Sequence, residues 1–210
     1  MDLPDSASQT ARRGGRGARE RILDAATTLF YRDGINATGV DRLAQQASVS
    51  KRTFYQHFSS KTELVEKYLR HLEDGAGLER ERVLQVGDEL PRERLLALFD
   101  GAPPGRMRGC PFHNAAVEAA DAMPGVDDVV RRHKLAFTDR LIQLAEEADA
   151  KDPVRLGNQL AVLFEGACAL ATSLNDSAPF AHARSAAETL IDGAIGPSMA
   201  AARRGRSGDR

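Results

Sequence analysis

Cationic and amide side chains gather in one short segment, residues 51–61, of this 210-residue chain. Lys51, Arg52 and Gln56 are polar, whereas Phe54 and Phe58 are apolar and lie one helical turn apart. A guanidinium can form a bidentate pair with guanine, and a carboxamide can do so with adenine, each contributing roughly 1–3 kcal/mol of discrimination. A helix over this segment would therefore carry hydrogen-bonding groups of these kinds on one side.

The segment from Val40 to Phe58 has the organisation of a helix-turn-helix. A helix of about eight residues would end in a tight turn at residues 47–50, where Ser50 is a plausible N-cap for the helix that follows. Ala44 and Ala47 are small, as the crossing of two helices requires. We therefore expect Phe54 and Phe58 to anchor the second helix in a core, with its polar side facing outward.

Helices are also predicted on both sides of this unit. The preceding one ends at Gly34 in the manner of a C-cap, and its apolar face has helical spacing. That face comprises Ile22, Ala25, Ala26, Leu29 and Phe30. In the following helix Ser60 is the expected N-cap, with Glu63 completing a capping box. Its apolar face comprises Leu64, Val65, Tyr68, Leu69 and Leu72.

The remainder of the chain also reads as helix, so we predict an all-α fold. A helix is expected from Pro91 through Phe99, and others over about 110–121, 125–149, 153–174 and 179–195. Asp152 and Pro153 form a strong start signal, an N-cap carboxylate followed by proline at the first helical position. No run of alternating β-branched residues predicts a strand. Residues 1–17 and 201–210 lack apolar periodicity, and we expect a disordered basic arm and a disordered tail.

Composition and charge favour a soluble protein with a nucleic-acid-binding front half. Hydrophobic residues make up 42% and charged residues 28%, and no apolar run is long enough to cross a bilayer. The polar, Arg-rich first thirty residues do not resemble a secretion signal, so a cytoplasmic location is expected. Residues 1–72 contain 12 Lys and Arg against 8 Asp and Glu, and the rest contains 17 against 22. A basic front half suits contact with a polyanion.

The stretch LFYRDGINATGVDRLAQQASVSKRTFYQHFSSKTELVEKYL, within about Arg19–Leu69, resembles the tetracycline-repressor (TetR) family of regulators. The resemblance implies an N-terminal helix-turn-helix DNA-binding domain over 18–64 and a helical ligand-binding and dimerisation domain over 65–200. It also implies two groups of DNA contacts. Side chains that reach base edges correspond to Lys51, Arg52, Thr53 and Gln56. Side chains that contact phosphates correspond to Thr38, Tyr55, His57 and Lys61.

Two positions depart from the family pattern. Gly39 stands where a capping Thr or Ser is usual, so Thr38 or the backbone must satisfy the first amides of that helix. Ser48 stands where glycine is usual in the turn, so it must adopt a conformation that glycine adopts more easily. The N-terminal arginines could enter an adjacent minor groove or form a solvated basic tail. They are Arg12, Arg13, Arg16 and Arg19.

The resemblance also implies a homodimer on a palindromic operator, with the last two helices at the interface. On the first of these helices the apolar band is Leu160, Leu163, Phe164, Ala167, Cys168, Leu170, Ala171 and Leu174. On the second it is Ala183, Ala187, Leu190, Ile191 and Ala194. The alternative is that both bands are buried within one subunit.

An effector cavity is expected from the segment RGCPFHNAAVE, which is similar to the start of the sixth helix in one branch of the family. The expected lining residues are Cys110, Phe112, His113, Asn114, Val117, His133, Phe137, Phe164 and Cys168. Such a lining suits a small, mostly hydrophobic effector.

Cys110 precedes a helix and could instead be a redox sensor, although the sequence places no resolving cysteine near it. Cys110 and His113 have metal-pair spacing, but no further ligands are visible. Packing is the default role for both cysteines, and we expect no cofactor.

We therefore expect a ligand-responsive repressor that its effector releases from DNA, and not an enzyme. An enzyme on a helical bundle would need an acid/base or nucleophile constellation. The sequence has no nucleophile elbow, no Gly-rich phosphate loop and no Glu-x-x-His pairs. A further alternative is an interaction module that has kept this fold and lost DNA binding.

Overall fold

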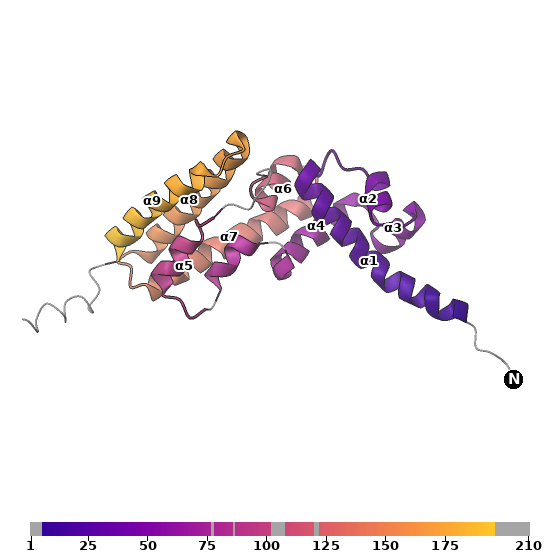
Figure 1. Ribbon diagram of the computed structural model, residues 1–210, viewed down its shortest axis with the longest axis horizontal. Helices are drawn as coiled ribbons and strands as arrows, with labels where there is room; N and C mark the ends of the chain where they lie inside the picture. Colours follow the sequence, from indigo (N-terminus) through magenta and orange to yellow (C-terminus); the bar gives the residue numbers. More distant parts are fainter. Residues whose placement is uncertain (1–5, 77, 86, 102–107, 120–121, 196–210) are drawn as a thin grey trace, which may run out of the picture. The chain divides into compact units, whose positions relative to one another are not determined.

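The computed structural model describes residues 6–76, 78–85, 87–101, 108–119 and 122–195 (Figure 1). Within these ranges the regular elements are helices, and extended pairing is limited to one isolated bridge between Ala150 and Ile195. The prediction of an all-α fold is therefore confirmed. Among the described helices, none is long and apolar enough to span a bilayer.

The chain forms two compact units. Unit 1 comprises Met1–Gly77 and Pro111–Arg132, and unit 2 comprises Leu78–Cys110 and His133–Arg210. The helices of unit 1 are α1 (Ser6–Asp33), α2 (Val40–Gln46), α3 (Lys51–His57), α4 (Lys61–His71), the π-helix η1 (Leu72–Ala76) and α6 (Pro111–Ala119). Those of unit 2 are the 3₁₀-helix η2 (Glu79–Leu84), α5 (Pro91–Ala97), α8 (Pro153–Leu174) and α9 (Ala178–Ala194). Helix α7 (Pro124–Glu147) contributes residues to both.

This division differs from the predicted domains, 18–64 and 65–200. Helix α4 crosses the predicted boundary without interruption, because Leu64, Val65 and Leu69 are all buried in unit 1. The ring of Tyr68 packs edge-on against Phe30 of α1, with centroids 5.4 Å apart. The buried residues on both sides of position 64 lie in unit 1, so the predicted boundary does not coincide with the division of the structure.

The N-terminal helix is also longer than expected. Helix α1 begins at Ser6, inside the segment 1–17 that we predicted to be a disordered arm. Alanine and arginine are among the strongest helix formers, so this segment can extend an existing helix without an apolar face of its own. The predicted tail, residues 201–210, lies outside the described residues.

The predicted helix starts are confirmed by their caps. The Ser50 hydroxyl accepts a hydrogen bond from the Thr53 amide at 3.0 Å. The Ser60 hydroxyl accepts one from the Glu63 amide, also at 3.0 Å. Asp152 caps α8 in the same way, directly before Pro153. Each cap satisfies an amide that the first turn of its helix would leave without a partner.

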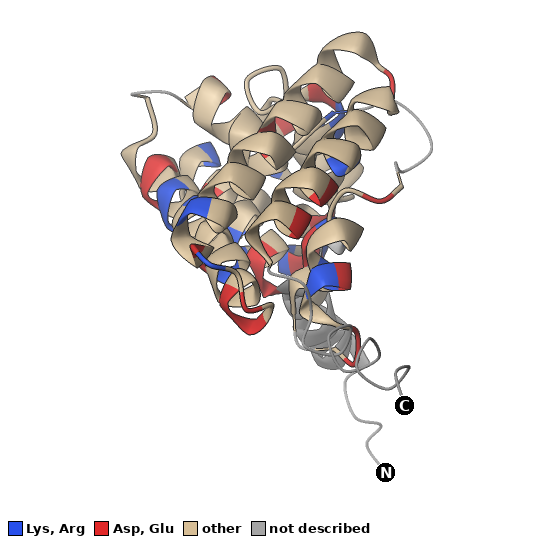
Figure 2. Cartoon of the chain, turned by 90° about the vertical axis from the view of Figure 1, so that its left-hand side faces the viewer, with Lys and Arg blue, Asp and Glu red and all other residues tan. Residues whose placement is uncertain are grey.

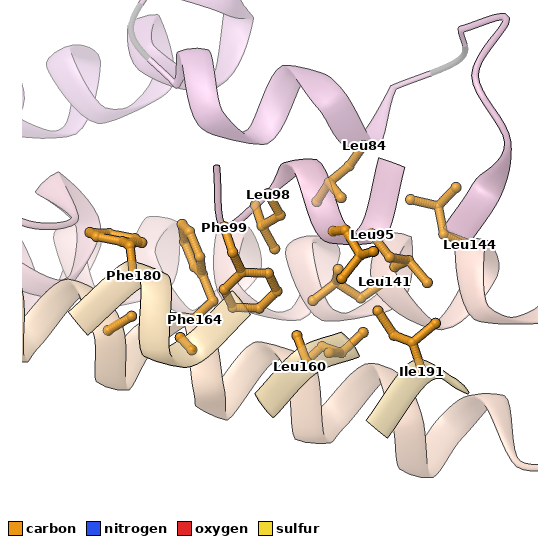
Figure 3. Close-up of a cluster of buried hydrophobic side chains, with 14 of the residues drawn as sticks. Leu84, Leu95, Leu98, Phe99, Leu141, Leu144, Leu160, Phe164, Phe180 and Ile191 are labelled. Atoms are coloured by element: carbon orange, nitrogen blue, oxygen red, sulfur yellow. The ribbon is translucent and has the colours of Figure 1, made fainter. Parts of the chain in front are cut away.

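The core of unit 2 is rich in phenylalanine and leucine (Figure 3). The ring of Phe164 on α8 lies 5.4 Å from Phe137, 6.1 Å from Phe99 and 6.2 Å from Phe180, between ring centroids. Helices α8 and α9 lie side by side around this core (Figure 1).

The apolar bands predicted for a dimer interface are mostly buried inside this core. The buried members are Leu160, Phe164, Ala167, Cys168, Ala171, Ala183, Ala187 and Ile191. The interface prediction is therefore wrong for these residues, and the alternative of burial within one subunit is correct for them. Alanine and leucine fit a core and an interface equally well, so the sequence alone does not distinguish the two roles. Leu170 and Leu174 remain 56% and 64% exposed.

Candidate nucleic-acid interface

The polar face of α3 is presented by two buried phenylalanines. Phe54 is completely buried, and Phe58, the residue that ends the helix, is only 1% exposed. Their rings lie 6.0 Å apart. Lys51, Arg52 and Gln56 are exposed on the same helix. The predicted amphipathic recognition helix is thus confirmed as a structural element.

The other α3 side chains lie at the edge of this polar face. Thr53 is half-buried, and its hydroxyl lies 2.9 Å from that of Ser50. Tyr55 is 53% exposed and rests its ring edge against Phe54. Lys51 Nζ lies 2.5 Å from Asp41 Oδ1, and both side chains are more than half exposed. An exposed ion pair is worth little in water, so a phosphate or base can replace the Asp41 carboxylate without great cost.

Thr38 does not belong to this interface. Its side chain is completely buried, and its hydroxyl donates a 2.7 Å hydrogen bond to the Gly34 carbonyl oxygen. This burial contradicts our prediction that Thr38 contacts a phosphate. The residue instead closes the loop between α1 and α2. It does not cap α2 either, because Gly39 is the N-cap residue and no side-chain hydrogen bond is made there.

The turn between α2 and α3 is held from two directions. Ser48 has a φ of +53°, the left-handed conformation expected for a residue at a glycine position. Its amide donates to the Gln45 carbonyl at 3.1 Å. Arg21 on α1 donates from Nε to the Ala47 carbonyl at 3.0 Å. The position of α3 is therefore fixed by backbone bonding and by a side chain of α1.

Lys61 stands at the first turn of α4, beside the Ser60 cap. Burial lowers the pKa of Lys61 below its ordinary value, and the negative charge of Glu118 partly offsets this. A phosphate at this helix start would meet both the ammonium group and the first amides of the helix. His57, at the end of α3, is half-buried.

Two residues that the sequence did not suggest brace the loop before α2. The Asn36 amide donates to the Glu118 carboxylate at 2.8 Å, and the Asn36 carboxamide donates to the Glu118 carbonyl oxygen at 2.8 Å. Glu118 lies on α6, 82 positions further along the chain. No spacing rule connects residues so far apart, so a single sequence carries no signal for this contact.

The proposed arginine arm is described only at its last member. The guanidinium of Arg19 lies over the Phe58 ring, 5.5 Å from its centroid. Arg19 thus packs on the anchor of α3 and is not part of a free tail. The side chains of Arg12, Arg13 and Arg16 lie outside the described part of the structure.

The predicted effector residues are divided between the two units. Cys110, His133, Phe137, Phe164 and Cys168 belong to unit 2, and all five are buried. Phe112, His113, Asn114 and Val117 belong to unit 1. Of these four, Phe112 is completely buried, whereas His113 is exposed and Val117 is 66% exposed. The exposure of His113 and Val117 argues against their lining an enclosed apolar cavity.

His133 has a polar environment that the sequence did not predict. Its Nε2 lies 3.2 Å from Glu81 Oε1, and Arg140 donates to Glu81 Oε2 at 3.1 Å. The Arg140 guanidinium balances the charge of the buried Glu81 carboxylate, and the His133 ring gives that carboxylate a second hydrogen-bonding partner. His133 therefore has a structural role in unit 2. No group of three potential metal ligands occurs among the described residues, and the Cys110–His113 pair is not extended.

A groove of about 350 Å³ lies elsewhere in unit 2, between the start of α8 and the end of α9. Its lining is Lys151, Asp152, Arg155, Leu156, Gln159, Thr189, Leu190, Gly193 and Ala194. None of the predicted effector residues contributes to it.

A helix with buried anchors and an exposed polar face, held in a helix-turn-helix, is the arrangement that helix-turn-helix regulators use to bind DNA. Comparison with known proteins gives the family. The model of bacterial regulatory proteins of the tetR family matches residues 22–68. The model of the tetracyclin repressor-like C-terminal domain matches residues 91–187.

A solved structure named as a tetR transcriptional regulator, from Streptomyces avermitilis, is 34% identical to this chain with a TM-score of 0.73. The match covers 84% of this chain and 97% of the other. The chain therefore belongs to the tetR family of bacterial transcriptional regulators, and not to a family of enzymes.

Curated relatives match a shorter part of the chain. The transcriptional activator FasR of Mycolicibacterium smegmatis is 44% identical over 68 residues, which are 30% of this chain and 31% of FasR. The transcriptional repressor KstR2 of Rhodococcus jostii is 40% identical over 81 residues, which are 38% of this chain and 39% of KstR2. The matches thus span about a third of the length of these relatives.

Proposed function

We propose that the protein is a homodimeric repressor that binds a palindromic DNA operator through α3 and is released by a small, mostly hydrophobic effector. The observation that carries the DNA-binding part is the amphipathic α3, with Phe54 buried and Arg52 and Gln56 exposed. Such a helix places its exposed side in the major groove. Base edges are read by Lys51, Arg52, Thr53 and Gln56. Phosphates are bound by Tyr55, His57 and Lys61, which set affinity and register.

The dimer is supported by an exposed apolar row on α8. Val162 is 75% exposed, Leu170 56% and Leu174 64%. Together with Gly166 they recur every four residues, so they follow one side of the helix. A Cβ atom at Gly166 would have no neighbour within 4 Å, so this side is open to the approach of another helix. Apolar side chains in a continuous exposed row favour burial against a second subunit.

Aromatic residues of unit 2 and the names of two relatives support the effector class and the direction of regulation. Phe137 and Phe164 are buried with their ring centroids 5.4 Å apart, so a ligand that packs against them would have to be hydrophobic. Repression agrees with the name of KstR2, whereas FasR is named as an activator. A protein of this kind works where the chromosome is, so we assign it to the cytoplasm.

The DNA-binding proposal is tested by fluorescence anisotropy with the fragment upstream of the protein's own gene and with a random fragment of equal length. We expect specific binding whose affinity falls steeply with salt, because cationic side chains displace counterions from phosphates. Equal affinity for both fragments would remove the operator from the proposal. No binding even at low salt would favour the interaction module that has lost DNA binding.

The dimer and the effector need separate tests. Leu170→Lys should produce monomers in analytical ultracentrifugation and weaken operator binding, while the control Gln143→Lys, at an exposed position of α7, should leave the dimer intact. A monomeric wild-type protein would refute the dimer.

For the effector, a promoter reporter is exposed to a panel of small aromatic compounds, and release by one of them should be lost in Phe137→Leu. A reporter that responds to none of these compounds, or that responds as strongly in Phe137→Leu as in wild type, would contradict the proposed ligand class.

A further inference from the structure

The two cysteines of the chain belong to one cluster in unit 2, although they lie far apart in the sequence. Cys110 is 7% exposed, and Cys168, on α8, is 6% exposed. Gly109 has a φ of +66° and approaches α8 closely. A Cβ atom at Gly109 would lie 3.3 Å from the Cys168 carbonyl oxygen and 2.5 Å from Thr172 Oγ1. The residue next to it, Cys110, is therefore held against the turn of α8 that carries Cys168.

A lysine lies directly against the first sulfur. Lys134 Nζ is 3.2 Å from Cys110 Sγ, and the same ammonium forms an ion pair with Glu165. Burial alone lowers the pKa of Lys134, but the attraction of Cys110 and Glu165 and their hydrogen bonds outweigh it, so the pKa is raised. The ammonium is retained, and a retained cation beside a sulfur stabilises the thiolate form.

The second sulfur has the opposite character. Burial, followed by the charges of Cys110 and Glu165, raises the pKa of Cys168 to about 12. Cys168 is thus a neutral thiol while Cys110 is intact. Two cysteines of one cluster with such different surroundings suit an attacking residue and a resolving one.

Access to the cluster is limited but present. The side chains of Lys134 and Glu165 are 27% and 28% exposed. Solvent therefore reaches the polar side of the cluster, while both cysteine residues remain more than nine-tenths buried. A small oxidant can approach Cys110 along these side chains, whereas a bulky reagent is hindered.

We propose that Cys110 and Cys168 form an oxidation-responsive pair, in which a small two-electron oxidant such as hydrogen peroxide reacts at Cys110 and Cys168 then closes a disulfide. This inference goes beyond the proposed function. It also corrects our expectation that no resolving cysteine lies near Cys110.

The chemistry balances in two steps. The Cys110 thiolate attacks one peroxide oxygen, the O–O bond breaks, and hydroxide leaves and takes up a proton to become water. The product is a sulfenic acid at Cys110, which no longer carries the negative charge that helped to raise the pKa of Cys168. The Cys168 sulfur then attacks the Cys110 sulfur, the S–O bond breaks, and water leaves with the thiol proton. Two thiols are oxidised, and one peroxide is reduced to two waters.

In the test, the reduced full-length protein is treated with hydrogen peroxide and then alkylated under denaturing conditions. The products are analysed by intact mass and by peptide mapping. Wild type should lose two hydrogen atoms, resist alkylation and yield a peptide linking Cys110 to Cys168. Cys168→Ser should stop at a sulfenic acid on Cys110 that dimedone traps. Lys134→Met should slow oxidation by about tenfold, since it removes the cation beside the thiolate. The control Lys151→Met changes an exposed lysine of the same unit and should react like wild type.

An equal oxidation rate in Lys134→Met and wild type, or a persistent sulfenic acid in wild type, would each overturn the proposal. Because mass is measured without DNA, failure here is distinguishable from failure of operator binding.

Discussion

The backbone amide of Asn36 donates a 2.8 Å hydrogen bond to the carboxylate of Glu118, joining the loop before the helix-turn-helix to α6. The same carboxylate lies close to Gly34, where a Cβ atom would be 3.0 Å from Glu118 Oε2. Gly34 has a φ of +97°, so the loop needs glycine for its conformation and for this close approach. Glu118 thus acts as a positioning residue for the segment that leads into α2.

Glu118→Gln should loosen this loop, because it replaces a charge-assisted hydrogen bond by a neutral one. We expect the free energy of unfolding to fall by about 1 kcal/mol. Faster amide hydrogen exchange at Asn36 should accompany this loss. The matched control Glu20→Gln, at an exposed position of α1, should change neither quantity. Unchanged exchange at Asn36 in Glu118→Gln would show that the carboxylate charge does not hold the loop.

Arg52→Ala and Lys61→Ala should weaken DNA binding in different ways. Removing the Arg52 guanidinium should cost about 1–3 kcal/mol on the operator and relax preference at one base pair. Removing the Lys61 ammonium should weaken all sequences alike and reduce the salt slope by about one. Anisotropy titrations on operator and random DNA at several salt concentrations measure both effects. Equal losses from both variants on both fragments would contradict the division between base and phosphate contacts.

Ser48→Gly should stabilise the turn between α2 and α3. Ser48 has a φ of +53°, a conformation that costs a non-glycine residue about 1 kcal/mol or more. Glycine removes this strain but adds conformational freedom to the unfolded chain. The expected increase in the free energy of unfolding is therefore below about 1 kcal/mol. Urea unfolding measures it, with Ser48→Ala as a control that keeps the strain. A loss of stability in Ser48→Gly would mean that the serine hydroxyl contributes more than the strain removes.

Gly157→Ala should destabilise unit 2 by about 1–3 kcal/mol, as expected for overpacking. A Cβ atom at Gly157 would lie 2.5 Å from Ile142 Cγ1 and 2.8 Å from the Ile142 backbone nitrogen, so α7 and α8 would have to separate. At Gly193 on α9 a Cβ atom would meet nothing within 4 Å. Gly193→Ala should therefore leave the thermal midpoint unchanged or raise it slightly. Similar midpoints for the two variants would refute close packing at Gly157.

Glu63→Gln should remove part of the acid sensitivity of folding. Hydrogen bonds from the Ser59 side chain and amide lower the pKa of Glu63. A lowered folded-state pKa means that the unfolded chain binds the proton more tightly. The stabilisation is present above the ordinary glutamate pKa and is lost as the pH falls through the folded-state value. The unfolding free energies of wild type and Glu63→Gln should thus differ most near neutrality and converge in acid. A constant difference would contradict this linkage.

Local periodicity and capping chemistry were sufficient to predict the elements around α3. Phe54 and Phe58 repeat at one helical turn, and Ser50 and Ser60 are caps because their hydroxyls bond to amides three residues away. Such signals lie within one or two turns of the chain, so a sequence displays them directly.

Other features depend on packing between distant residues and could not be predicted. Thr38 is polar and adjacent to the helix-turn-helix, yet its hydroxyl is used inside the fold by Gly34. Glu118 and Asn36 meet across 82 positions. Cys168 carries an apolar pattern on α8, and only the close approach of Gly109 brings Cys110 to it.

The separation of roles on α3 has a consequence for how such a regulator changes its target. The fold is held by Phe54 and Phe58, while Arg52 and Gln56 stand in solvent and contribute little to the core. Substitutions at the two solvent-facing positions are therefore nearly free of folding penalties. New operator preferences can be selected there, by evolution or by library screening, while the scaffold beneath stays unaltered.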